Sequence, residues 1–91
     1  PNTFSPNNDG MNDYFFPRSN KGVVIKSLRI YNRWGQVVFQ KSNFPANNYA
    51  YGWDGKFNNA TQKSDVYVYI MEVECSNGNT VIRKGDVSLL R

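Results

Sequence analysis

The acidic side chains are the groups with which this chain could carry out acid–base chemistry, and they have no histidine to work with. The 91 residues include seven Asp and Glu, no His and one cysteine, Cys75. Without imidazole, a Ser or Cys nucleophile lacks its usual general base and zinc lacks its commonest ligand. Glycoside hydrolysis needs two opposed carboxylates, whereas Glu72 and Glu74 fall on the same face of one predicted strand. The sequence therefore predicts a protein that is not an enzyme.

A polar segment near the start, residues 5–13, has part of the spacing of a calcium-binding loop. Side-chain oxygens stand at its first, third and fifth positions, a glycine at its sixth and a carboxylate at its ninth. If calcium binds, we expect Asn7, Asp9 and Asp13 to hold it, and the chain would then be a calcium-stabilised adhesive spacer without another cofactor. The alternative is a series of Asx turns, with a positive φ at the glycine. The residues in those turns would be Asn7, Asp9, Gly10 and Asn12.

Two tryptophans stand beside turn-forming residues. Trp34 precedes Gly35, and Trp53 precedes Asp54 and Gly55. An exposed aromatic ring on a small β domain can stack on a sugar ring, so a carbohydrate-binding module is one hypothesis. The alternative is that each tryptophan closes an end of the hydrophobic core.

The distribution of charge argues against nucleic acid as a partner. The formal net charge is +4, but the eleven Lys and Arg residues are spread singly or in pairs and form no basic stripe. The chain also has no apolar run of about 18 residues, so we expect no membrane-spanning segment. Its first residues lack the charged and apolar regions of a signal peptide, and we therefore expect a piece of a longer protein.

Alternation of apolar and polar residues predicts an all-β fold. In residues 23–32, Leu28 and Ile30 point to one face, and residues 36–41 form the returning strand of a hairpin. Gly35 supplies the positive φ that a short hairpin with a bulge requires.

The strongest predicted strand covers residues 65–75. From Tyr67 onward, every second residue is apolar and shares one face. Val66 and Val68 on the other face are also apolar, so we expect the first half of this strand to be buried on both faces, at the centre of a sandwich. The dipeptide that follows, Asn77-Gly78, predicts a type I′ hairpin turn.

About seven short strands fit one domain over residues 1–91. Shorter strands are expected at residues 13–16, 56–57, 80–83 and 87–90, and residues 42–51 read as a loop. This spacing favours an immunoglobulin-like antiparallel β-sandwich over a closed barrel.

Five stretches of the chain, taken in order, resemble one protein family. It is the gliding-motility-associated, type B C-terminal domain of proteins that the type IX secretion system of Bacteroidetes exports. The stretches are PNTFSPNNDGMNDYFFP at 1–17, IYNRWGQVVFQ at 30–40, GWDGKFN at 52–58, DVYVYIMEV at 65–73 and KGDVSLLR at 84–91. Asn8 departs from the family pattern, which usually has glycine there. Residues that match the family's motifs are Asp9, Gly10, Asn12, Asp13, Asn32, Trp34, Gly35, Trp53, Asp54 and Gly55.

The resemblance implies a role as a C-terminal secretion signal. The parent protein, an adhesin or another large surface protein, would pass through the periplasm. The outer-membrane type IX translocon, together with a PorP/SprF-like outer-membrane protein, would then carry it to the cell surface or the extracellular space. The domain itself would be a monomer that promotes surface attachment.

The final strand is the expected recognition site. Residues 87–90 are predicted to form an edge strand, whose backbone groups could pair with a strand of the translocon. Candidate recognition residues are Gly85, Asp86, Val87, Leu89, Leu90 and Arg91.

Overall fold

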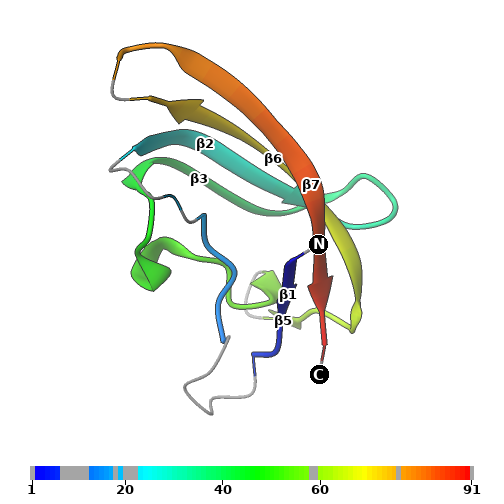
Figure 1. Cartoon of the computed structure of the whole chain (residues 1–91). Coiled ribbons are helices and arrows are strands. Elements are labelled where there is room, and N and C mark those ends of the chain that lie inside the picture. Colours follow the sequence, from blue (N-terminus) through cyan, green and yellow to red (C-terminus); the bar gives the residue numbers. More distant parts are fainter. Residues whose placement is uncertain are drawn as a thin grey trace.

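The computed structural model describes residues 2–6, 13–17, 19, 23–57, 60–75 and 77–90, and in these ranges the chain is almost entirely β (Figure 1). The strands are β1 (Asn2–Phe4), β2 (Val24–Tyr31), β3 (Val37–Pro45), β4 (Lys56–Phe57), β5 (Ala60–Thr61), β6 (Asp65–Glu74) and β7 (Thr80–Leu89). One turn of 3-10 helix, η1 (Tyr49–Tyr51), lies between β3 and β4. The prediction of an all-β, sandwich-like fold is confirmed.

Five strands form one curved sheet in the order β1-β7-β6-β2-β3. Neighbouring strands are antiparallel except for β1 and β7, which run parallel, so the sheet is mixed. The second layer is small: the β4-β5 ribbon, η1 and residues 13–17 lie on the concave side of the large sheet (Figure 1). Phe15 joins this layer to the turn before β4, because its N–H and carbonyl both bond to the backbone of Trp53, at 2.9 and 2.8 Å.

The hydrophobic core fills the concave side of the sheet. Every second residue of a strand points to the same face, and on β7 these residues include Val87 and Leu89, both fully buried. Trp53 meets them from the covering layer. Its ring centroid lies 5.0 Å from that of Tyr67 and 5.4 Å from that of Phe4. Burying one such large apolar side chain contributes about 1.5–3 kcal/mol, so this cluster is the main link between the two layers.

The convex face of the sheet is exposed to solvent. Val66 and Val68 of β6 are 49% and 43% exposed, so the prediction that this strand is buried on both faces is wrong. No part of the described chain covers them on this side. Their β-branched side chains favour a strand whether or not the face is buried, which is why the apolar run misled the prediction.

Two segments outside the predicted strands belong to strands in the structure. β3 continues through the polar Ser42 and Asn43 because its pairing with β2 continues, and Phe44 beyond them is buried opposite Ile25. β7 likewise runs unbroken through the polar residues before Val87, in regular register with β6. By contrast, the strand predicted at residues 13–16 is reduced to the single bridge between Phe15 and Trp53.

The turn between β6 and β7 differs from the predicted type I′ hairpin. The N–H of Cys75 donates to the carbonyl of Asn79 at 2.8 Å, and the N–H of Gly78 donates to the carbonyl of Cys75 at 2.9 Å. A type I′ turn needs a positive φ at both central residues. Here Gly78 has φ of 86°, and Asn77 is not in the positive range. Of residues 77–79, which the structure describes, Gly78 alone has a positive φ.

Candidate recognition surface

The final strand does not offer the free edge that the sequence predicted. Residues Val87 to Leu89 pair with β6 on one side and with β1 on the other. The N–H of Leu90 also donates to the carbonyl of Phe4 at 3.0 Å. The edge prediction is therefore wrong for this stretch, because the first strand of the chain occupies it. Leu90 is 52% exposed, and Arg91 lies outside the described residues.

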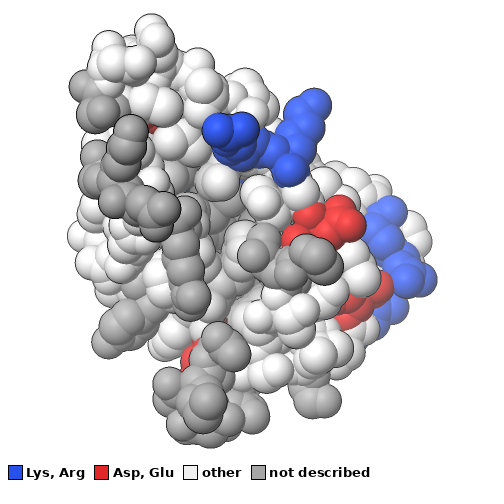
Figure 2. Space-filling view, in the orientation of Figure 1, with Lys and Arg blue, Asp and Glu red and all other residues white. Residues whose placement is uncertain are grey.

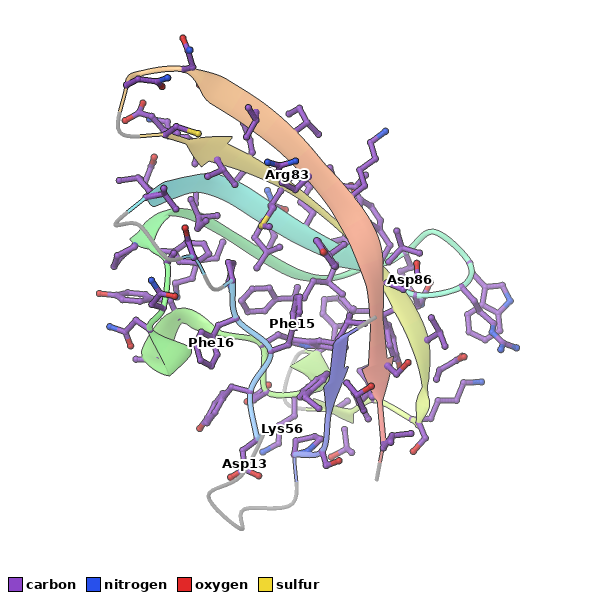
Figure 3. The ribbon with its side chains drawn as sticks, in the orientation of Figure 1. Asp13, Phe15, Phe16, Lys56, Arg83 and Asp86 are labelled. Atoms are coloured by element: carbon purple, nitrogen blue, oxygen red, sulfur yellow. The ribbon has the colours of Figure 1, made fainter. Side chains whose placement is uncertain are left out.

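The other two candidates on β7, Gly85 and Asp86, lie in the part of the strand that β1 does not reach. Arg83 and Lys84 precede them, and both basic side chains are exposed. Figure 2 shows blue side chains over this part of β7 with red below them. Figure 3 places Arg83 toward the concave side and Asp86 on the opposite side. Within the described ranges, neither Arg83 nor Lys84 has an ion-pair partner. The sequence motif KGDVSLLR pointed to this strand but not to Arg83.

The hairpin between β2 and β3 presents Trp34 at its tip. The side-chain oxygen of Asn32 accepts hydrogen bonds from the backbone N–H groups of Trp34 and Gln36, at 3.0 and 2.9 Å. Gly35 has the predicted positive φ, 79°. Hydrogen bonds within the turn therefore stabilise it, and the Trp34 side chain at its tip is 69% exposed.

Two cations lie against the Trp34 ring. The guanidinium carbon of Arg33 is 5.6 Å from the ring centroid, and the ammonium of Lys63 is 4.8 Å from it. Arg33 also donates to a carboxylate oxygen of Asp65 at 3.0 Å. The hydrogen bond from the Val66 backbone N–H, and after it the Arg33 guanidinium, hold the pKa of Asp65 below its ordinary value. Lys63 is far from Trp34 in the sequence, so no local pattern indicated this contact.

Trp53 has a structural role. It is fully buried, and its indole N–H donates to the carbonyl of Lys56 at 2.9 Å. Asp54 accepts the backbone N–H of Lys56 at 3.0 Å, and Gly55 has φ of 82°. A ring without exposed surface cannot stack on a sugar, so of the two tryptophans only Trp34 remains available for that chemistry.

Two of the three predicted calcium ligands lie outside the described residues. Asn7 and Asp9, like Gly10 and Asn12 of the alternative Asx turns, lie outside them, and only Asp13 lies within. The described part of the chain holds no cluster of three acidic, cysteine or histidine side chains that could bind a metal.

A family model, the CHU_C type IX secretion signal domain, matches residues 1–89. The chain belongs to this family. The suspected relation to the C-terminal domains of type IX cargo is therefore confirmed. A type IX secretion signal domain interacts with the secretion machinery, and its protein is exported to the cell surface or beyond it. No curated protein shows significant sequence similarity to the chain.

In this secretion signal domain, the covering layer leaves part of the concave face open. A cavity of about 460 Å³ lies there. Its walls come mainly from apolar side chains of β6 and β7 and from the loops that approach them. They include Met71, Val73, Cys75, Val81 and Arg83. The cavity borders the basic part of β7, so the two features form one continuous surface. Among the described residues no helix has the length and apolar character needed to cross a membrane.

Proposed function

We propose that this domain directs a large cell-surface protein, an adhesin or a gliding-associated protein of Bacteroidetes, through the type IX translocon and promotes its attachment to the surface. The match of the family model to residues 1–89 supports this proposal. Five sequence stretches in the family's order support it further.

The proposed partners are the outer-membrane translocon and a PorP/SprF-like outer-membrane protein. The domain would reach them from the periplasm, already folded. The described structure supports recognition in the folded state, because Trp34 and Lys63 are brought together only by folding. The basic part of β7 likewise borders the cavity only when β6 and β7 are paired.

The proposed role is binding and not catalysis. Composition supports this, since the sequence has no His and a single Cys. Exposed tryptophan and arginine side chains, here Trp34 and Arg83, are of types that are enriched where proteins bind one another. No cofactor is required for such a role.

The proposal is tested by fusing residues 1–91 to a periplasmic reporter in a cell that has type IX secretion. We expect the reporter on the cell surface or in the medium when the PorP/SprF-like protein is present, and in the periplasm when it is deleted. A control fusion carrying Trp53→Ala, which removes the centre of the core, should stay in the periplasm. Retention of the unaltered fusion in a fully competent cell would refute the proposal.

A second candidate function, glycan binding, is favoured by the exposure of Trp34. It predicts that a glycan array gives signals that Trp34→Ala removes. An array without signals above background excludes this function for the isolated domain.

A further inference from the structure

Among the described residues, none pairs with β7 between Thr80 and Asp86 on the side away from β6, which leaves a free edge there. We propose that this edge receives an extended acidic segment of a partner protein, which adds to the sheet as a further strand. The identity of that partner as a component of the export machinery rests on the proposed function. The edge itself, and the chemistry of the strand that it accepts, follow from the structure.

Two backbone hydrogen bonds show which groups of β7 point away from β6. The carbonyl of Asn79 accepts the N–H of Cys75 on the β6 side, whereas the N–H of Leu90 donates to β1 on the opposite side. Backbone groups alternate in direction along an antiparallel strand, and the β6-β7 register is continuous from residue 80 to 89. The N–H and carbonyl groups of Ile82, Lys84 and Asp86 therefore point outward, to the side of β1.

β1 is too short to satisfy these outward groups. It pairs only with residues Val87 to Leu89, and no described residue pairs with the preceding part of β7 on that side. A row of unpaired N–H and carbonyl groups is a template for strand addition. A partner strand would continue the sheet beyond the point where β1 ends.

The opposite edge of the sheet is blocked against the same process. β3 contains Asn43 with φ of 55°, which interrupts the extended backbone. Its last residue, Pro45, has no N–H to donate. Lys41 turns inward, with its ammonium 5.5 Å from the ring centroid of Tyr51. Irregular backbone, proline and inward charges are the devices by which natural sheets prevent edge pairing. The described part of β7 before β1 begins contains neither a proline nor a residue with positive φ, and its one charged side chain on the concave side, Arg83, lines the cavity.

Charge along the free edge selects the partner. Arg83 lies toward the concave side, and Lys84, the next residue, toward the convex side. A strand added here would place two consecutive residues beside these cations, one on each face. Acidic residues at both positions would supply the two missing ion-pair partners. The expected partner segment therefore has adjacent carboxylates at its centre.

Apolar residues are expected in the part of the added strand that lies beside Val81 and Ile82. Val81 and Ile82 precede the basic pair, and Ile82 is 55% exposed. The cavity of about 460 Å³ beside Val81 can receive apolar side chains from the concave face of an added strand. Cys75 lines the same cavity, so the rate at which its thiol is alkylated shows whether the cavity is covered.

Amide hydrogen exchange on the isolated domain tests the edge directly. The N–H groups of Arg83 and Gly85, which point to β6, should exchange slowly, and those of Ile82, Lys84 and Asp86 at least tenfold faster. Slow exchange of all five in the free domain would overturn the inference, because the edge would then already be paired.

A designed peptide tests the partner's chemistry. The probe is an acetylated and amidated octapeptide, Thr-Val-Val-Glu-Glu-Val-Val-Thr, whose near-symmetric sequence allows parallel or antiparallel pairing. It should slow exchange of the three outward amides at least tenfold and slow alkylation of Cys75 by N-ethylmaleimide. The matched peptide with Lys-Lys at its centre should do neither. Equal effects of the two peptides would refute the acidic specificity, and no effect of either at millimolar concentration would refute strand addition.

Two variants separate the edge from the proposed function. Ile82→Pro removes one outward N–H without removing a bond to β6, and R83E/K84E reverses the basic pair. Each should abolish peptide binding and lower reporter export at least tenfold, whereas the control R29E/K56E, with the same charge change elsewhere on the exposed surface, should leave both unchanged. Thermal unfolding verifies that all variants fold. If the unaltered fusion is not exported, the proposed function fails. If it is exported and folded Ile82→Pro and R83E/K84E are exported equally well, the inference about the edge fails.

Discussion

The ring of Tyr69 lies over Gly85, its directly opposite residue on the neighbouring strand. A methyl carbon built at Gly85 would lie 2.6 Å from the Tyr69 hydroxyl oxygen and 2.7 Å from the ring carbon that bears it. The ring cannot easily give way, since it packs against Phe15 with 5.3 Å between centroids. The glycine of the KGDVSLLR motif is thus explained by its cross-strand neighbour.

We therefore expect Gly85→Ala to destabilise the domain by about 1–3 kcal/mol, the usual cost of forcing extra atoms into a packed site. Urea unfolding measures this loss. In a Tyr69→Ala background the space is vacant, and the same substitution should be neutral or stabilise by up to about 1 kcal/mol, because alanine costs less backbone entropy than glycine. Equal losses in both backgrounds would show that the ring is not the cause.

Asn32→Ala should destabilise the domain by about 1–2 kcal/mol, because the Asn32 side chain accepts two backbone hydrogen bonds at the hairpin tip. Asn32→Asp keeps an acceptor oxygen and should cost less. At the other hairpin the Asn77 side chain accepts one such bond within the described residues, from the backbone N–H of Asn79 at 3.0 Å, so Asn77→Ala is the matched control. Chemical denaturation compares the three, and a larger loss for Asn77→Ala would contradict this explanation.

The two tryptophans should differ sharply on substitution. Trp53→Ala removes a fully buried side chain and is expected to cost about 3–5 kcal/mol. Trp34→Ala changes an exposed site and should stay within about 0.5 kcal/mol. Fluorescence checks the assignment independently. Quenching by acrylamide should be strong in Trp53→Phe, which retains only the exposed ring, and weak in Trp34→Phe. Similar quenching in both variants would contradict the burial of Trp53.

Lowering the pH should remove the contribution of ionised Asp65 to the stability of the domain. The Val66 N–H and Arg33 lower the pKa of this carboxyl in the folded state from its ordinary value of 3.8. A lowered folded-state pKa stabilises the protein above the unfolded value, and that contribution is lost as the pH falls through the folded one. Asp65→Asn should therefore show a smaller fall in melting temperature between about pH 5 and about pH 2 than the unaltered domain. An identical fall would show that Asp65 does not contribute.

Much of the fold follows from local sequence patterns, for reasons that are local. The period of two placed Leu28 and Ile30 on the buried face of β2, because side chains alternate along any strand. Gly35 marked the β2-β3 turn because few other residues adopt a positive φ. The family could also be predicted from the sequence, because its motifs are defined by the residue types at particular turns and strands.

The working surface depended on tertiary structure. Alternation reports which residues share a face, but not whether another layer covers that face, so Val66 and Val68 were assigned to the interior although they lie on the open convex side. Strand edges are decided by partners far away in the chain. Asn2 pairs with Val87, and this contact closes the edge that was predicted at residues 87–90. No described residue pairs on that side with the earlier part of β7, residues 80–86. The sequence by itself determined the secretion signal family and the approximate positions of the longer strands. Long-range pairing decided where on β7 a partner can bind.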